Sequence, residues 1–119
     1  MDIQAAKALC RTFPGAAEDV KWGADAVFSV GGKMFAVSAV DVAARQISFK
    51  VDDERFLEMT DRPGIVPAPY LARAKWVQAR DDASISDAEA AALLRRAYEL
   101  VFAKLTKKLQ REIRAAAVP

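Results

Sequence analysis

Two adjacent glycines within "SVGGKMFAV", residues 29–37, constrain the fold of this chain more than any other feature of its sequence. Glycine readily adopts the positive φ that a primed two-residue turn requires, and apolar runs flank the pair on both sides. We therefore predict a β-hairpin. Its register pairs Val30 with Lys33, Ser29 with Met34 and Phe28 with Phe35.

The same glycines could instead belong to a phosphate-binding loop, since a lysine follows them. A Walker loop separates its first glycine from its Gly-Lys pair by four residues and places Ser or Thr after the lysine. Val27 and Met34 occupy those two positions here. The sequence therefore favours a structural turn, with Lys33 projecting from the hairpin end, over a nucleotide site.

Three segments have the pattern of helices. Apolar residues recur at helical spacing over 2–13, with Asp2 as the expected N-cap, and "SDAE" at 86–89 is a capping box that opens a long helix. "DDERFLEMTD" predicts a short helix with Phe56 and Leu57 turned inward, and with Met59 or Thr60 as further candidates for the same face.

The remaining regular segments predict strands. Segments 16–22, 46–51 and 73–80 are read as extended, whereas three prolines keep 62–70 out of the centre of a sheet. Helices and strands in this order predict an α+β fold: a single antiparallel sheet covered on one face by helices, in one domain over 1–119.

The amino-acid composition limits the metal sites and catalytic groups that this chain can form. The chain has 119 residues, one cysteine and no histidine, so it lacks the usual ligands of zinc and iron sites and the base of a Ser or Cys triad. Asp52, Asp53 and Glu54 form the densest acidic run, but they stand where carboxylates favour a helix start. We expect no catalytic residues, no metal and no cofactor, and we expect Cys10 to be a core thiol.

Several motifs in order resemble the MmcQ/YjbR family of small bacterial proteins. They are "FPGAAEDVKWGADAVFSVGGKMFAV", "ISFKVDDERFLEM", the strand containing Trp76, and "AYELVFAKLTKKL", which together extend from about Leu9 to Gln110. The resemblance implies a CyaY-like fold, which in this family is proposed to present two loop wings to a DNA duplex. It therefore implies a non-enzymatic, DNA-binding role.

Two positions depart from the family pattern. Where many members carry a histidine or asparagine and paired basic residues before the tryptophan, this chain has "YLARAKW", with only Arg73 and Lys75 charged. Thr106 stands where many members have proline before paired lysines, and it is suited to cap a final helix.

Basic residues concentrate near the C-terminus, although the whole chain carries a formal charge of only +2. Apolar residues recur every four positions along this segment. We therefore expect an apolar stripe of the helix to pack against the domain and another, basic stripe to be exposed. The expected contacts to DNA phosphates are Lys104, Lys107, Lys108 and Arg111, with Lys33, Lys50, Arg73 and Lys75 as second contacts at the sheet end. An ordinary solvated helix face remains the alternative.

The uncovered face of the sheet is a second candidate surface. By the hairpin register it carries small or semi-apolar side chains: Val27, Ser29, Met34, Ala36 and Ser38, joined by Ser48 and Lys50. This face predicts an alternative function as a protein-interaction module, and a monomer or weak homodimer. Core or near-core packing is favoured for Trp22 and Trp76, and no small-molecule substrate is evident.

The expected location is the cytoplasm. No apolar run approaches the roughly 20 residues needed to span a bilayer, and a single cysteine cannot form an internal disulfide. We therefore expect neither a membrane partner nor secretion.

Overall fold

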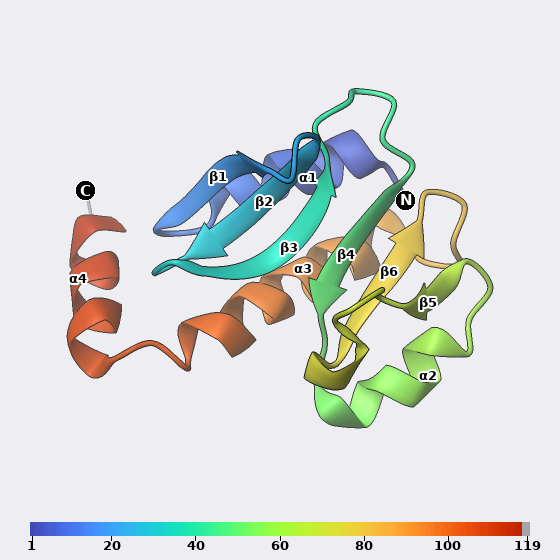
Figure 1. Ribbon diagram of the computed structural model, residues 1–119. Coiled ribbons are helices and arrows are strands. Elements are labelled where there is room, and N and C mark those ends of the chain that lie inside the picture. Colours follow the sequence, from blue (N-terminus) through green and yellow to red (C-terminus); the bar gives the residue numbers. More distant parts are fainter. Residues whose placement is uncertain (118–119) are drawn as a thin grey trace.

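A computed structural model describes residues 1–117, and in it six antiparallel strands form one sheet in the order β1-β2-β3-β4-β6-β5 (Figure 1). The strands are β1 (Ala16–Lys21), β2 (Asp25–Val30), β3 (Lys33–Ala39), β4 (Gln46–Lys50), β5 (Ile65–Pro67) and β6 (Trp76–Arg80). The helices are α1 (Ile3–Thr12), α2 (Phe56–Thr60), α3 (Asp87–Phe102) and α4 (Lys107–Ala117), with 3-10 turns at Asp53–Arg55 and Ala72–Ala74. The predicted α+β class is confirmed.

Local side chains set the starts of the two main helices, as the sequence predicts. Asp2 Oδ1 accepts a hydrogen bond from Ala5 N–H at 3.0 Å, and Ser86 Oγ accepts one from Glu89 N–H at 3.1 Å. These bonds satisfy backbone donors that have no partner inside the helix. They fix where α1 and α3 begin on one face of the sheet.

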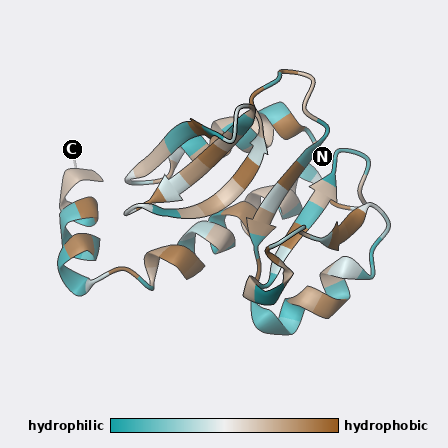
Figure 2. Ribbon diagram, viewed as in Figure 1, coloured by the Kyte–Doolittle hydropathy of each residue, from teal (hydrophilic) through white to brown (hydrophobic). Residues whose placement is uncertain are grey.

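The core lies between that face and these two helices. Hydrophobic residues recur along the central strands and along α3 (Figure 2). Phe35 packs against Phe13 and Tyr98 with ring centroids 5.9 and 5.6 Å apart, which joins β3 to both helices. Cys10 is fully buried among these residues, and burial raises the pKa of its thiol to about 12, so it is a core thiol as expected.

The Gly-Gly turn and the first two predicted pairs of the hairpin, including Ser29 with Met34, are confirmed, but the third pair is wrong. Gly31 and Gly32 have φ of +58° and +80°, and Val30 pairs with Lys33 as predicted. A β-bulge then shifts the register, so that Phe28 pairs with Ala36 instead of Phe35. Because the bulge adds one residue to β3, consecutive residues of that strand are both buried in the core.

The bulge corrects the predicted uncovered face. Ala36 and Ser38 pair with core residues of the neighbouring strands and therefore lie on the helix-covered face, where both are buried. Val37 takes the uncovered face instead, opposite Val27 and Ser48. A two-residue turn determines the first pairs of a hairpin, and it carries no information about a bulge further along.

One further expectation needs correction, and another is refined. Leu57, predicted to face inward, is 80% exposed, whereas Met59, one of the two further candidates for that face, is fully buried. The proline-containing segment stays out of the centre of the sheet, as predicted, but it is not loop throughout, because β5 pairs with β6 at the sheet edge. An edge position suits Pro67, which lacks the N–H that a central strand needs.

Helix α4 packs against the turns at one end of the sheet rather than on its face (Figure 1). A Cβ at Gly31 would lie 2.7 Å from Leu105 and 3.0 Å from Leu109, and one at Gly15 would lie 2.9 Å from Ile113. Glycine at these turns therefore allows the apolar stripe of α4 to approach closely. Within residues 1–117, no helix has both the length and the apolar character to cross a bilayer.

Candidate nucleic-acid interface

The antiparallel topology brings most of the predicted phosphate contacts to one end of the sheet. Lys33 is the first residue of β3, Lys50 the last of β4, and Lys75 immediately precedes β6. Since adjacent strands run in opposite directions, these three positions lie at the same end. We call this region, together with the cations of 104–111, the basic end.

Direct contacts connect its members. Lys50 Nζ donates a hydrogen bond of 2.6 Å to the carbonyl of Ala74, which lies between Arg73 and Lys75 in the chain. Burial and the nearby charge of Lys104 lower the pKa of Lys50. Lys50 therefore lies near Lys104 and beside the backbone that carries Arg73 and Lys75, although 54 positions separate residue 50 from residue 104 in sequence.

Lys75 has a particular backbone conformation. Its φ is +61°, in the left-handed region, and its ammonium lies 5.1 Å from the centroid of the Phe56 ring. Its carbonyl accepts a hydrogen bond of 2.9 Å from Val51 N–H, which ties the start of β6 to the end of β4. The ring and the β4 contact hold this cation at the basic end.

Helix α4 extends the basic end past the β2–β3 turn. Leu105 and Leu109 lie against Gly31, so the first turn of α4 is next to the turn that carries Lys33. Thr106 Oγ1 accepts a hydrogen bond of 3.2 Å from Leu109 N–H and caps the helix, as its position suggests. With this apolar stripe turned inward, α4 exposes the three predicted cations Lys107, Lys108 and Arg111.

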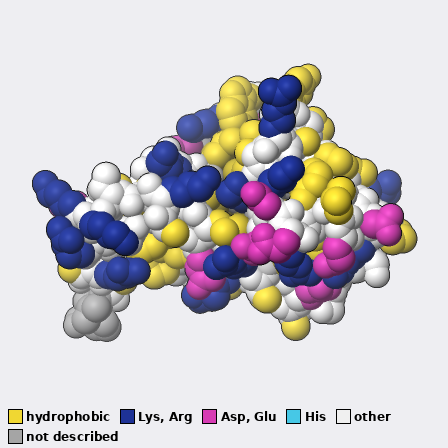
Figure 3. Space-filling model, turned by 90° about the horizontal axis from the view of Figure 1, so that it is seen from below, with side chains coloured by type: hydrophobic (Ala, Val, Ile, Leu, Met, Phe, Trp, Pro, Cys, Tyr) yellow, Lys and Arg dark blue, Asp and Glu magenta, His cyan; other side chains and the backbone are white. Residues whose placement is uncertain are grey.

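The distribution of charge on the surface agrees with the outward orientation of these α4 cations. In Figure 3, basic side chains gather over α4 at the left, whereas the right side carries both signs. The ion pairs between residues 1–117 use arginines at other places: Arg11, Arg45, Arg55, Arg62, Arg80 and Arg96. None of the eight predicted phosphate contacts takes part in them, although the carboxylates of Asp52 and Asp53 lie near enough to act on Lys50 and Glu112 follows Arg111 in α4.

The acidic run at 52–54 has a structural role in the described chain. Asp52 accepts two hydrogen bonds from Arg96, at 2.8 and 2.9 Å, and this pairing lowers the pKa of the carboxyl group. The pair links the segment after β4 to α3. Among the described residues, no group of three or more Cys, Asp or Glu side chains is arranged to hold a metal ion.

Comparison with known proteins agrees with the motifs. The profile described as YjbR matches residues 11–100, about three quarters of the 119-residue chain. The chain belongs to the YjbR family. A search of curated proteins finds no significant match.

Two solved structures resemble this YjbR protein. The crystal structure of protein DR2400 from Deinococcus radiodurans, with a domain of the family DUF419, is 28% identical, with a TM-score of 0.81 over 93% of this chain and 86% of that one. The crystal structure of a protein from Pseudomonas syringae is 19% identical, with a TM-score of 0.69 over 85% of this chain and 99% of that one. The second likeness concerns the fold alone.

The uncovered face of the YjbR sheet differs from its prediction in one further respect. Trp76 is buried, as expected, but Trp22 is 69% exposed and is not a core residue. Residues 22–24 form the β1–β2 turn, where Trp22 has φ of +52°. The prediction that Trp22 packs in the core rested only on its apolar sequence context and is wrong. The sequence analysis also missed Gln78 and Tyr70, which border the same face.

Proposed function

We propose that this protein binds nucleic acid, as a non-enzymatic DNA-binding protein that contacts the phosphate backbone through its basic end. One observation carries the proposal: eight lysines and arginines from four separate segments lie along one edge of the sheet and the adjoining helix α4, and none has an ion-pair partner within residues 1–117. The site residues are Lys33, Lys50, Arg73, Lys75, Lys104, Lys107, Lys108 and Arg111.

Phosphate is the partner chemistry that such a surface favours. Cations that neutralise phosphates release condensed counterions, which drives binding without reading the sequence. The first turn of α4 adds free backbone N–H groups and the positive end of the helix dipole beside Lys107 and Lys108. No helix with the pattern of a recognition helix accompanies them, so we expect little discrimination between bases and affinities on the order of micromolar at low salt.

Protein interaction through the uncovered sheet face is the alternative function. The exposure of Trp22 and Tyr70 beside that face favours it. It predicts a mass that rises with concentration in light scattering, with no effect of substitutions at the basic end. For the DNA-binding function we expect a cytoplasmic location, in keeping with a buried, unpaired Cys10.

Fluorescence anisotropy with a labelled DNA duplex at low salt tests the proposal. The basic-end variant carries Lys107→Gln, Lys108→Gln and Arg111→Gln. A matched control carries Lys21→Gln, Arg45→Gln and Arg80→Gln, which remove the same charge at the opposite end of the sheet.

The proposal expects at least tenfold weaker binding for the basic-end variant and a smaller change for the control. Equal effects of the two variants would mean that only net charge matters. Absence of duplex binding by the parent protein would contradict the proposed function.

A further inference from the structure

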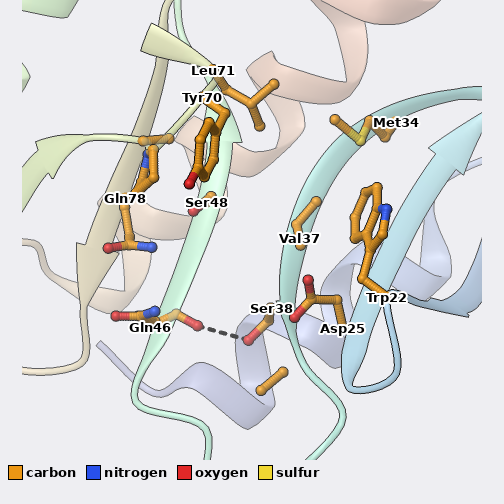
Figure 4. A pocket seen from close by; sticks show the side chains of 13 residues that line it. Trp22, Asp25, Met34, Val37, Ser38, Gln46, Ser48, Tyr70, Leu71 and Gln78 are labelled. Atoms are coloured by element: carbon orange, nitrogen blue, oxygen red, sulfur yellow. Dashed lines mark hydrogen bonds between the residues drawn. The ribbon is translucent and has the colours of Figure 1, made fainter.

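A pocket of about 580 Å³ opens on the uncovered face of the sheet (Figure 4). Its floor is made by side chains in register across three strands, Val37 of β3, Ser48 of β4 and Gln78 of β6. The β1–β2 turn and the loop before β6 form its two sides. This volume lies within the range of sites that hold a small organic group.

An aromatic residue stands on each side of the pocket. Trp22 comes from the β1–β2 turn and Tyr70 from the loop that follows β5, and Figure 4 shows their rings on opposite sides of the floor. Trp22 is 69% exposed and Tyr70 is fully exposed, so neither ring contributes much to the core. Both have positive φ, +52° and +66°, a conformation that costs a bulky residue free energy.

Three polar side chains of the pocket, those of Gln46, Ser48 and Gln78, make no hydrogen bond within residues 1–117. Gln46, Ser48 and Gln78 present amide and hydroxyl groups, and the one hydrogen bond marked among the lining residues runs from Ser38 to the backbone carbonyl of Gln46 (Figure 4). Side-chain amides offer both donors and acceptors. A ligand with a flat face and a hydrogen-bonding edge would satisfy the rings and the amides together.

The charged residues near the pocket are distributed unevenly between its two sides. Asp25 lines the side near Trp22, and among residues 1–117 no lysine or arginine lines the pocket. Along β4, however, Gln46 and Ser48 are followed on the same face by Lys50, which belongs to the basic end. An anionic group attached to the ligand is therefore repelled at one side of the pocket and attracted at the other.

We propose that this pocket binds an unpaired nucleobase, with the attached phosphates directed along β4 toward Lys50 and the rest of the basic end. The inference rests on the proposed function and deepens it, because it makes a single strand the preferred nucleic acid. In a duplex the faces of the bases are stacked and inaccessible, whereas a single strand can place a base against exposed aromatic rings.

The test compares a labelled oligothymidylate single strand with a duplex of equal length. The pocket variant carries Trp22→Ala and Tyr70→Ala. Its control carries Val42→Ala and Leu57→Ala, which truncate two exposed apolar side chains outside the pocket. A second variant, Trp22→Phe with Tyr70→Phe, keeps both rings, and thermal melting checks that every variant folds.

We expect the pocket variant to bind the single strand at least about fivefold more weakly, with duplex affinity unchanged and the phenylalanine variant close to the parent. Nuclear magnetic resonance shifts on adding the strand should include the amides of Ser48 and Gln78. Single-strand affinity that is indifferent to the pocket variant, while the basic-end variant still weakens duplex binding, would overturn the pocket and leave the proposed function standing.

Two other results would also overturn the inference. Binding of thymidine monophosphate in the pocket without binding of the strand would make the ligand a free nucleotide. Binding of neither strand nor duplex by the parent protein would remove the proposed function, and the pocket inference with it.

Discussion

Gly31 and Gly32 share a turn and a positive φ, but their surroundings differ. A Cβ at Gly32 would meet nothing within 4 Å, whereas one at Gly31 would lie 2.7 Å from both terminal carbons of Leu105. We expect Gly32→Ala to lower the free energy of unfolding by about 1 kcal/mol through backbone strain alone. Gly31→Ala should cost about 2–3 kcal/mol, because Leu105 must also move. Urea denaturation measures both, and equal costs would contradict this packing of α4.

The pairing of Asp52 with Arg96 predicts a pH dependence. Because the pKa of Asp52 is lower in the folded chain than in the unfolded one, its contribution is complete above the unfolded value and is lost as pH falls through the folded value. Asp52→Asn should therefore destabilise the protein at pH 7, by about 1 kcal/mol or less since Arg96 is half exposed. Near pH 2 the difference should shrink, and urea denaturation showing the same difference at both pH values would refute the assignment.

At the scale of elements, α4 begins with two lysines, which the helix dipole disfavours at that end. Lys107→Glu with Lys108→Glu should therefore raise the free energy of unfolding by roughly 0.5–2 kcal/mol, while weakening binding to nucleic acid. Thermal melting and anisotropy on the same samples measure the two effects. A loss of both stability and binding would mean that these lysines serve the fold.

The bulge in β3 gives a second prediction about an element. Ala36 is fully buried against the helices, so Ala36→Glu should destabilise the fold by several kcal/mol through burial of an unpaired charge. Val37→Glu, one residue along, places the charge on the uncovered face and should cost less. A melting temperature that falls more for Val37→Glu than for Ala36→Glu would contradict the bulge and favour the uninterrupted register.

These elements show which parts of the fold the sequence specifies locally. The caps at Asp2 and Ser86 and the glycine turn depend on neighbouring residues, and each is confirmed. The bulge, the pairing of β5 and the exposure of Trp22 depend on partners distant in sequence, which a local pattern does not contain. The errors at Ala36 and Ser38 follow from that single extra residue in β3.

At the scale of the whole molecule, the cations of the candidate interface could be named from the sequence, because residue type determines charge. Their arrangement in space could not be predicted from it. Lys50 and Lys104 become neighbours only through the strand order and the path of α3. The pocket was not predictable, since its floor joins three strands and its rings come from two separate turns. The sequence predicted the composition of the candidate interface, and the topology determines its shape.

The salt dependence of duplex binding tests the central claim most directly. Each phosphate neutralised contributes about −0.9 to the slope of log affinity against log salt concentration. If Lys107, Lys108 and Arg111 each contact a phosphate, their replacement by glutamine should make the slope shallower by roughly 2–3, while the control at Lys21, Arg45 and Arg80 leaves it nearly unchanged. Parallel slopes for the parent, the basic-end variant and the control would contradict the account.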